Sequence, residues 1–343
     1  MRIITKQLRT LMQCMAILIT SQCSWFVTSG QETVDGIYIS DYAMPYVARI
    51  SLERAGAGLE ISPDNTLVPP TASFPFNTGL NLGVYLSYKF INLSVSQSLV
   101  SKTNNRSLVV ALNTYNQGNS FGGKFGFYNN VAALQDKKNL NVRSSINLFK
   151  FSPYWLVNTN YERFSIAAVS DYSKRQLRSA GAFMFELNPF FLQASGKNGM
   201  IIPSTDAYKS IFEDMAGLHK LTIINLDFRP GYAYTKVFDE GEYFISGGIF
   251  LGPGFGYHHA KTATYSKGGM HWQSSVRMAG SLGYNGDRYF IAGSFRYTNS
   301  FTPVSALGVL ADEGLFLITF GLRFNAVEDI LPKTWEELIG RRK

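Results

Sequence analysis

The sequence predicts an all-β fold, a single transmembrane antiparallel β-barrel of 12–14 strands, on three observations. Apolar and polar residues alternate with period two over segments of about ten residues, which is long enough for a tilted strand to cross a bilayer. Aromatic residues make up 14% of the 343 residues and charged residues 16%, whereas about 25% of a typical soluble domain is charged. The chain also begins with an export signal. Bacterial barrels of this class have an even number of strands.

Residues 1–30 are predicted to be a cleaved signal peptide. Three basic residues precede the apolar run at residues 15–19, small residues follow at 28–30, and the run is too short for a membrane-spanning helix. Both cysteines, Cys14 and Cys23, fall within this segment, so we expect the mature chain to use neither a disulfide nor a thiol. Lipidation of Cys23 is disfavoured because Gln22 stands where a small residue is expected.

Residues 31–45 are expected to form a periplasmic lead-in, and residues 46–325 to form the barrel. Candidate strands are 46–61, 80–88, 92–99, 107–115, 121–132, 145–157, 163–172, 179–192, 221–236, 242–257, 272–284, 289–298 and 316–324. The clearest alternation lies at residues 80–88, and the last three strands show it as well, with Leu282, Ile291 and Phe320 interleaved with small or polar residues. Residues 326–343 are expected to be a periplasmic tail, with a short helix possible from a capping box at Thr334.

These thirteen candidates conflict with an even strand number. Turns near Phe90, Tyr161, Asp239 and Gly286 resemble one another and should lie on one side of the membrane. An even number of candidates separates each consecutive pair except Tyr161 and Asp239, where there are three. Either a further strand lies within 193–220, or 163–192 is one bent element.

Three longer loops, 193–220, 258–271 and 299–313, are predicted on the outer side, because short turns of such barrels face the periplasm and long loops face outward. The proline-rich residues 62–77 are also predicted to be a loop.

Charged residues that the alternation places on the inner face are the candidate site. They can form a structural ion network or line a pore that selects anionic solutes. Asp227 and Arg229 share one face of one strand. The full set of lumen-lining candidates is Lys89, Asp227, Arg229, Arg277, Arg296 and Arg323.

Neither catalysis nor a cofactor is expected. The four histidines, His219, His258, His259 and His271, stand in no metal-binding motif, so no metal site is predicted. Residues 279–283 approach G-x-S-x-G but lack its first glycine and lie in a strand. The net charge of +8 includes three basic residues of the signal peptide and forms no basic run, so no nucleic-acid partner is expected.

Several ordered motifs resemble a known family. They are residues 229–235 (RPGYAYT), residues 175–181 (RQLRSAG), Gly283-Tyr284-Asn285 followed by Tyr289-Phe290-Ile291, and the early Asn81-Leu82-Gly83. Over roughly residues 34–324 the chain resembles the DUF4421 family of Bacteroidetes-type bacteria, whose function is not established. The resemblance implies an exported outer-membrane barrel and brings no catalytic residues.

The sequence is therefore interpreted as an outer-membrane barrel that acts as a structural protein or a passive pore for small solutes. One alternative is a surface-binding or assembly module that works through its long outer loops. Another is a membrane-embedded hydrolase of lipid or lipopolysaccharide, which would need a serine or carboxylate beside a histidine at the barrel rim. Expected partners are outer-membrane lipid, lipopolysaccharide and the barrel-assembly machinery.

Overall fold

The computed structural model describes residues 35–63, 71–101, 106–116, 118–133, 144–197, 199–304 and 307–326. The predicted signal peptide and the predicted helix near Thr334 lie outside these residues. No helix among them is long and apolar enough to cross a membrane.

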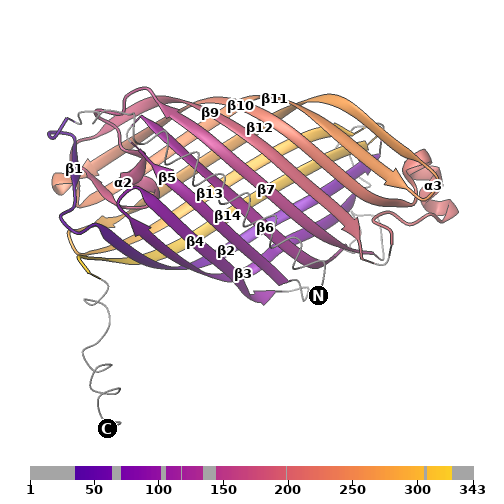
Figure 1. Cartoon of the computed structure of the whole chain (residues 1–343), viewed down its shortest axis with the longest axis horizontal. Coiled ribbons are helices and arrows are strands. Elements are labelled where there is room, and N and C mark those ends of the chain that lie inside the picture. The colour runs from indigo at the N-terminus through magenta and orange to yellow at the C-terminus, as the bar shows by residue number, and fades with distance from the viewer. Residues whose placement is uncertain are drawn as a thin grey trace, which may run out of the picture. The chain divides into compact units, whose positions relative to one another are not determined.

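Twelve antiparallel strands form a closed barrel, which confirms the predicted fold class (Figure 1). In chain order the strands are β2 (Tyr46–Pro63), β3 (Ala72–Tyr88), β4 (Ile91–Ser101), β5 (Arg106–Tyr115), β6 (Asn119–Ala132), β7 (Ser145–Asn158), β9 (Ala180–Gly196), β10 (Leu218–Phe238), β11 (Tyr243–Thr262), β12 (Ser266–Asn285), β13 (Tyr289–Val304) and β14 (Leu307–Phe324).

The last strand closes the barrel against the first. β14 pairs with β2 along its whole length, from Leu307 opposite Pro63 to Phe324 opposite Tyr46. Closure leaves no edge strand, so the backbone polar groups of the wall are satisfied within the sheet, as a lipid environment requires.

The conflict over strand number is resolved between β7 and β9. The predicted strand at 163–172 is wrong, because these residues include a short helix, α2 (Ile166–Ser170), whose N-cap Ser165 accepts a hydrogen bond from the Ala168 N–H. β8 (Lys174–Gln176) follows and pairs with β1 (Ile39–Asp41) from the predicted lead-in, as a separate two-stranded sheet. The turn at Tyr161 therefore does not join two barrel strands. It belongs to a segment of residues 159–179, which we call the insert.

Several predicted loops are strands instead. β11 continues to Thr262 and β12 begins at Ser266, so most of the predicted loop at 258–271 is a hairpin. β13 and β14 likewise pair as far as Val304 and Leu307, within the predicted loop at 299–313. Residues 72–76, predicted as part of a loop, pair with β2. Among the three predicted outer loops, 193–220 does hold a folded segment, with α3 (Asp206–Phe212) and the 3₁₀ turn η1 (Glu213–Met215).

The outward-facing side chains form an apolar belt with aromatic residues at its borders. On β13 the belt runs from Tyr289 through Ile291 and Phe295 to Tyr297, and all four side chains are exposed. Leu282 and Phe320 are exposed on the neighbouring strands β12 and β14, and Leu82 is exposed on β3. So large an exposed apolar surface is typical of contact with lipid rather than water. The predicted orientation of the two faces is therefore confirmed, and the barrel is of the transmembrane type.

The two ends of the barrel differ in what fills them. The end that carries the turns at Asp239 and Gly286 is here called the turn end. At the opposite loop end, inward residues of ten strands pack together with Ile201, Ile202, Phe212 and Met215 from residues 197–217, forming a dry loop-end core. At the turn end, Tyr172 of the insert packs against inward-facing Val47, Phe244 and Phe290.

An arginine at the middle of the apolar belt should destabilise the barrel far more than one at its border. Ile318 pairs with Gly293, midway between Tyr289 and Tyr297. We expect Ile318→Arg to lower the free energy of unfolding in lipid vesicles by about 2–4 kcal/mol, and Tyr289→Arg by about 0–1 kcal/mol. Denaturant titration of the two variants checks this, and equal losses would mean that these side chains do not face lipid.

Candidate functional site

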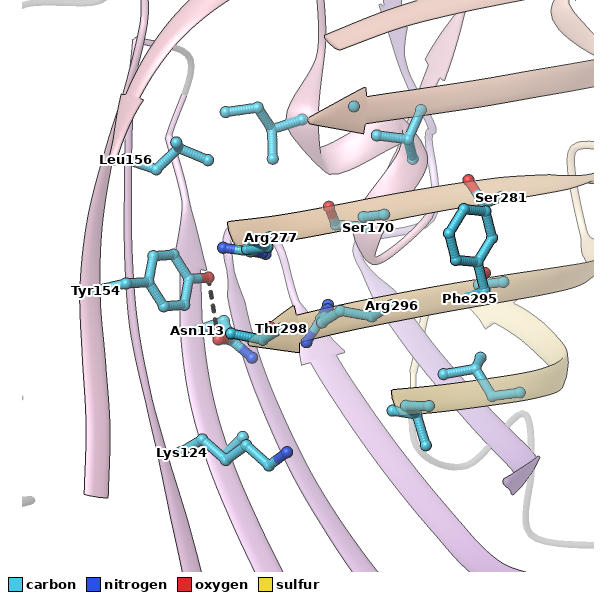
Figure 2. Close-up of a pocket in the computed structure, with 18 of the residues that line it drawn as sticks. Asn113, Lys124, Tyr154, Leu156, Ser170, Arg277, Ser281, Phe295, Arg296 and Thr298 are labelled. Atoms are coloured by element: carbon cyan, nitrogen blue, oxygen red, sulfur yellow. Dashed lines mark hydrogen bonds between the residues drawn. The ribbon is translucent and has the colours of Figure 1, made fainter. Parts of the chain in front are cut away.

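A cavity of about 300 Å³ lies within the barrel, lined by side chains of the strands and of the insert (Figure 2). Phe164, Ile166, Ser170 and Tyr172 line it from the insert, and Val109, which belongs to the loop-end core, also borders it. We call this cavity the chamber. It therefore lies between the two fillings of the lumen.

The chamber is lined by more positive than negative side chains. Among its described lining residues are the three carboxylates Glu53, Glu186 and Glu313, and six cationic side chains: Arg49, Lys124, Lys150, Arg229, Arg277 and Arg296. The lining is thus basic overall.

Two of the carboxylates each bind two cations. Glu186 accepts hydrogen bonds from Arg229 and from Arg277, one on each carboxylate oxygen, and its side chain is 1% exposed. Glu313 pairs in the same way with Lys124 and with Lys150, whose Nζ lies 2.8 Å from Oε2. Buried charges require such partners, because the interior solvates an isolated ion poorly.

The third carboxylate is held by hydroxyl groups instead. Glu53 accepts hydrogen bonds from Ser51 at 2.9 Å, from Tyr85 at 2.5 Å and from Ser96 at 2.6 Å. Because no ion pair of Glu53 occurs among the described residues, it neutralises none of the nearby arginines by direct contact.

Two arginines of the chamber make no ion pair with the described residues. Arg49 donates a hydrogen bond to the backbone carbonyl of Ser170 at 3.1 Å and lies over the ring of Tyr85, with Cζ 4.5 Å from the ring centroid. Arg296 projects into the chamber from β13 (Figure 2) and is exposed to it.

Small residues open the space beside these charges. On β11, β12 and β13 the inward positions nearest the arginines are small or lack a side chain, and all of them line the chamber: Ser246, Gly248, Ala279, Ser281 and Ser294. The loop-end core shows that this chain also fills its lumen with apolar side chains. The open chamber is thus a local feature rather than a property of the whole barrel.

The insert is organised around one glutamine. Gln176 is 3% exposed, and its Nε2 donates to the carbonyls of Tyr38, Arg163 and Arg178 while its Oε1 accepts from the Ser165 N–H. The side chain thus joins the lead-in to both limbs of the insert.

Hydrogen bonds and ring contacts attach the insert to the barrel wall. Arg323 of β14 donates to the Tyr172 carbonyl and to Asn285, and its guanidinium lies 3.5 Å from the ring centroid of Tyr42 in the lead-in. Arg175 of the insert forms an ion pair of 2.9 Å with Asp287 in the turn after β12. Apolar side chains of the insert also pack on the wall, Phe164 and Ile166 in one cluster and Tyr172 in another, so the insert is attached by both polar and apolar contacts.

Two ionisable groups of the insert and lead-in are buried. Burial raises the pKa of the Asp171 carboxyl above its ordinary value, although Arg49 opposes this effect. The Asp171 Oδ1 accepts two hydrogen bonds from Ser173, while Oδ2 has no hydrogen-bond partner in the described structure. Burial likewise raises the pKa of the Tyr42 hydroxyl, against the effect of Arg323.

The structure places three of the six sequence candidates in the chamber, two in buried positions elsewhere in the lumen and one outside the lumen. Arg229, Arg277 and Arg296 line the chamber. Arg323 is buried at the turn end, and Asp227 is buried on β10, where it accepts a hydrogen bond from Gln273.

Lys89 is the exception and lies outside the lumen. The alternation of β3 ends at Tyr88, and Lys89 is exposed in the turn to β4 with φ 51°. The prediction that Lys89 faces inward was wrong because it continued the alternation of β3 one residue beyond the end of the strand.

Sequence reasoning missed the other charged residues of the chamber: Arg49, Glu53, Lys124, Lys150, Glu186 and Glu313. The alternation of inward and outward residues along each strand could have identified them. Glu186 stands between outward Phe185 and Leu187, and Glu313 was hidden because its strand was interpreted as a loop.

Three of the four histidines, His258, His259 and His271, lie at the loop end of β11 and β12, and His219 lies near the start of β10. His258 and His271 contact each other through Nδ1 atoms 3.2 Å apart, and the described residues hold no cluster of three or more metal-ligating side chains. His259 Nε2 lies 2.9 Å from Ser266 Oγ, which is the kind of contact that a hydrolase requires. No described carboxylate forms a hydrogen bond or ion pair with His259, so the third member of a triad is missing there.

Comparison with known proteins gives one family and several similar barrels. A family model described as "Domain of unknown function (DUF4421)" matches residues 33–305. Among proteins of curated function, none matches the sequence.

Similar solved structures are outer-membrane proteins of low sequence identity. The outer membrane protease OmpT from Escherichia coli is 8% identical, with a TM-score of 0.36, covering 83% of this chain and 99% of that one. The toluene transporter TodX from P. putida is 8% identical, with a TM-score of 0.25 and coverage of 87% and 99%. Ail, the attachment invasion locus protein of Yersinia pestis, is 11% identical, with a TM-score of 0.20 and coverage of 82% and 99%.

Removing the charge of Glu186 should destabilise the barrel strongly. Glu186→Gln leaves Arg229 and Arg277 buried without their carboxylate, which costs about 3–5 kcal/mol when a buried pair is broken. Asp206→Asn is the control, because Asp206 is 99% exposed in its pair with Lys209 and its loss should cost less than about 0.5 kcal/mol. Denaturant unfolding measures both, and similar values for the two variants would contradict the role of Glu186.

Neutralising Asp171 should tighten the insert. Because the pKa of Asp171 is raised in the folded insert, the contribution of this carboxyl to the stability of the insert is present at low pH and is lost as the pH rises through the raised pKa. Asp171→Asn keeps the side chain neutral, and trypsin should therefore cleave the insert more slowly at pH 8. Faster cleavage would show that the ionised carboxylate stabilises the insert.

Proposed function

The chain belongs to the family described as Domain of unknown function (DUF4421), and from that premise we propose that it is a gated outer-membrane pore for small polar solutes. The structure corresponds to its closed state. The basic chamber is the middle of the pathway, the insert closes its periplasmic end, and the loop-end core closes its outer end.

The observation that carries this proposal is that the chamber is left open between the loop-end core and the insert. A purely structural barrel gains stability by packing apolar side chains into its interior, as the loop-end core does. The chamber instead combines small side chains with six cations, which stabilises the fold less than an apolar filling of the same shape would. A water-filled passage for solutes accounts for both features.

The contacts that close the two ends of the lumen differ in kind, and this difference supports a gate at the turn end. The insert meets the barrel through hydrogen bonds, one ion pair with the turn after β12 and two apolar clusters that are smaller than the loop-end core. The polar contacts exchange with water at a small net cost. Opening the loop-end core exposes apolar residues of the segment 197–217, such as Phe212, and costs more. We therefore expect an isolated barrel to be closed for most of the time.

Weakening both closures should convert the barrel into an open pore. Gln176→Ala removes the hydrogen bonds that organise the insert, and Phe212→Ala removes a side chain that is 2% exposed in the loop-end core. We expect the refolded wild-type chain in planar bilayers to show rare conductance steps and the double variant to show frequent ones.

The matched control changes the same residue types on the outer surface. Gln97 faces outward on β4 and Phe183, which is 67% exposed, faces outward on β9, so Gln97→Ala with Phe183→Ala should behave as the wild type does. Heat-dependent electrophoretic mobility shows whether each variant is folded. A folded Gln176→Ala, Phe212→Ala variant without conductance would identify the protein as a plugged scaffold.

A further inference from the structure

We propose that the chamber is a binding site for one small organic anion, whose carboxylate or phosphate group lies against the guanidinium groups of Arg296 and Arg277. This inference deepens the proposed function by naming the class of solute. It rests on that function only for the route by which the anion enters.

The first observation is the state of Arg296. Its side chain points into the chamber and is exposed to it, and among the described residues it makes neither a hydrogen bond nor an ion pair. An arginine has five N–H donors and stays charged at any physiological pH. The neighbouring Arg229, Arg277, Lys124 and Lys150 are bound two to each carboxylate, whereas the guanidinium of Arg296 points into the cavity.

The second observation is that positive charge is concentrated around this arginine. Arg277 is paired with Thr298, two residues from Arg296 on the same inner face, so the two guanidinium groups are diagonal neighbours. Arg277 must share Glu186 with Arg229, and Lys124, on the facing wall, must share Glu313 with Lys150. Glu53, the remaining carboxylate of the chamber, is held by the hydroxyls of Ser51, Tyr85 and Ser96 and forms no ion pair with Arg296. An anion placed beside Arg296 therefore relieves repulsion among several cations.

The third observation is that Arg277 is itself partly open to the chamber. Its Nη1 donates to Glu186, and its side chain is 18% exposed although it lines a buried lumen. A carboxylate or phosphate oxygen between Arg277 and Arg296 can therefore meet both side chains, because guanidinium groups bind such planar or tetrahedral anions through paired hydrogen bonds.

Neutral polar groups complete the site and indicate an organic anion. The Tyr154 hydroxyl donates to the Asn113 Oδ1 at 3.1 Å, on the wall facing the two arginines (Figure 2). Thr298, Ser281 and Ser294 add hydroxyls on the arginine side. These groups suit the hydroxyl or carbonyl groups of a small molecule, and the volume of about 300 Å³ is at the lower limit for small-molecule sites.

Binding of two simple anions to the full refolded chain tests the inference and separates the two possible anionic groups. Inorganic phosphate and succinate are each equilibrated by dialysis with the wild type and with the Gln176→Ala, Phe212→Ala variant. We expect one anion per chain for at least one of the two probes. Arg296→Gln should weaken this binding by at least about tenfold, the loss of one charged hydrogen bond.

Three further variants show whether the site is the one described. Arg296→Lys should retain part of the affinity, because the charge remains while the paired hydrogen bonds are lost. Ala279→Leu should abolish binding, since Ala279 is directly paired with Arg296 and lines the chamber. Arg288→Gln removes an exposed arginine of the turn after β12 and should change nothing.

The outcomes distinguish this inference from the proposed function. Absence of binding in both the wild type and the opened variant, or binding that Arg296→Gln leaves unchanged, overturns the anion site even if the opened variant conducts. Binding that depends on Arg296, in a barrel that never conducts, supports the site and overturns the gated pore.

Discussion

Closure of the sheet is the constraint on which the rest of this structure depends. Once β14 pairs with β2 along its whole length, every residue of the wall must face either the surrounding medium or a lumen of fixed width. The outward-facing side chains form an apolar belt with tyrosines at its borders. The inward-facing side chains must either fill the lumen or leave room for water, because the closed backbone cannot collapse.

The chain meets that requirement in three different ways along the barrel. Apolar side chains fill the loop end, with the help of residues 197–217. Charged side chains line the middle, where two glutamates are shared among four cations. Hydrogen-bonded backbone from the insert occupies the turn end, fastened by Arg323 and organised by Gln176. The chamber lies in the middle, and positive charge is in excess there.

Period-two alternation predicted the barrel wall well because the two faces of each strand meet unlike surroundings over a long distance. It placed Arg229, Arg277 and Arg296 inside, and the family resemblance was confirmed by the match over residues 33–305. The insert could not be predicted, because residues 163–172 carry apolar positions that suit a strand as well as a buried helix, and only contacts such as those of Gln176 decide between them. Glu313 was missed for a different reason. Polar residues near the loop end of β13 and β14 were interpreted as a loop, although the ladder continues there.

The central claim is that a hydrated, charged interior lies behind a lipid-facing belt. Electron spin-echo measurements of the contact between spin labels and D₂O test this claim most directly. Single spin labels would be placed at adjacent residues of β12, Leu282 on the outer face and Ser281 in the chamber, with Cys14 and Cys23 replaced by serine and the protein in vesicles in D₂O. The account predicts strong deuterium modulation at Ser281 and almost none at Leu282. Modulation at Leu282 with a dry Ser281 would contradict it.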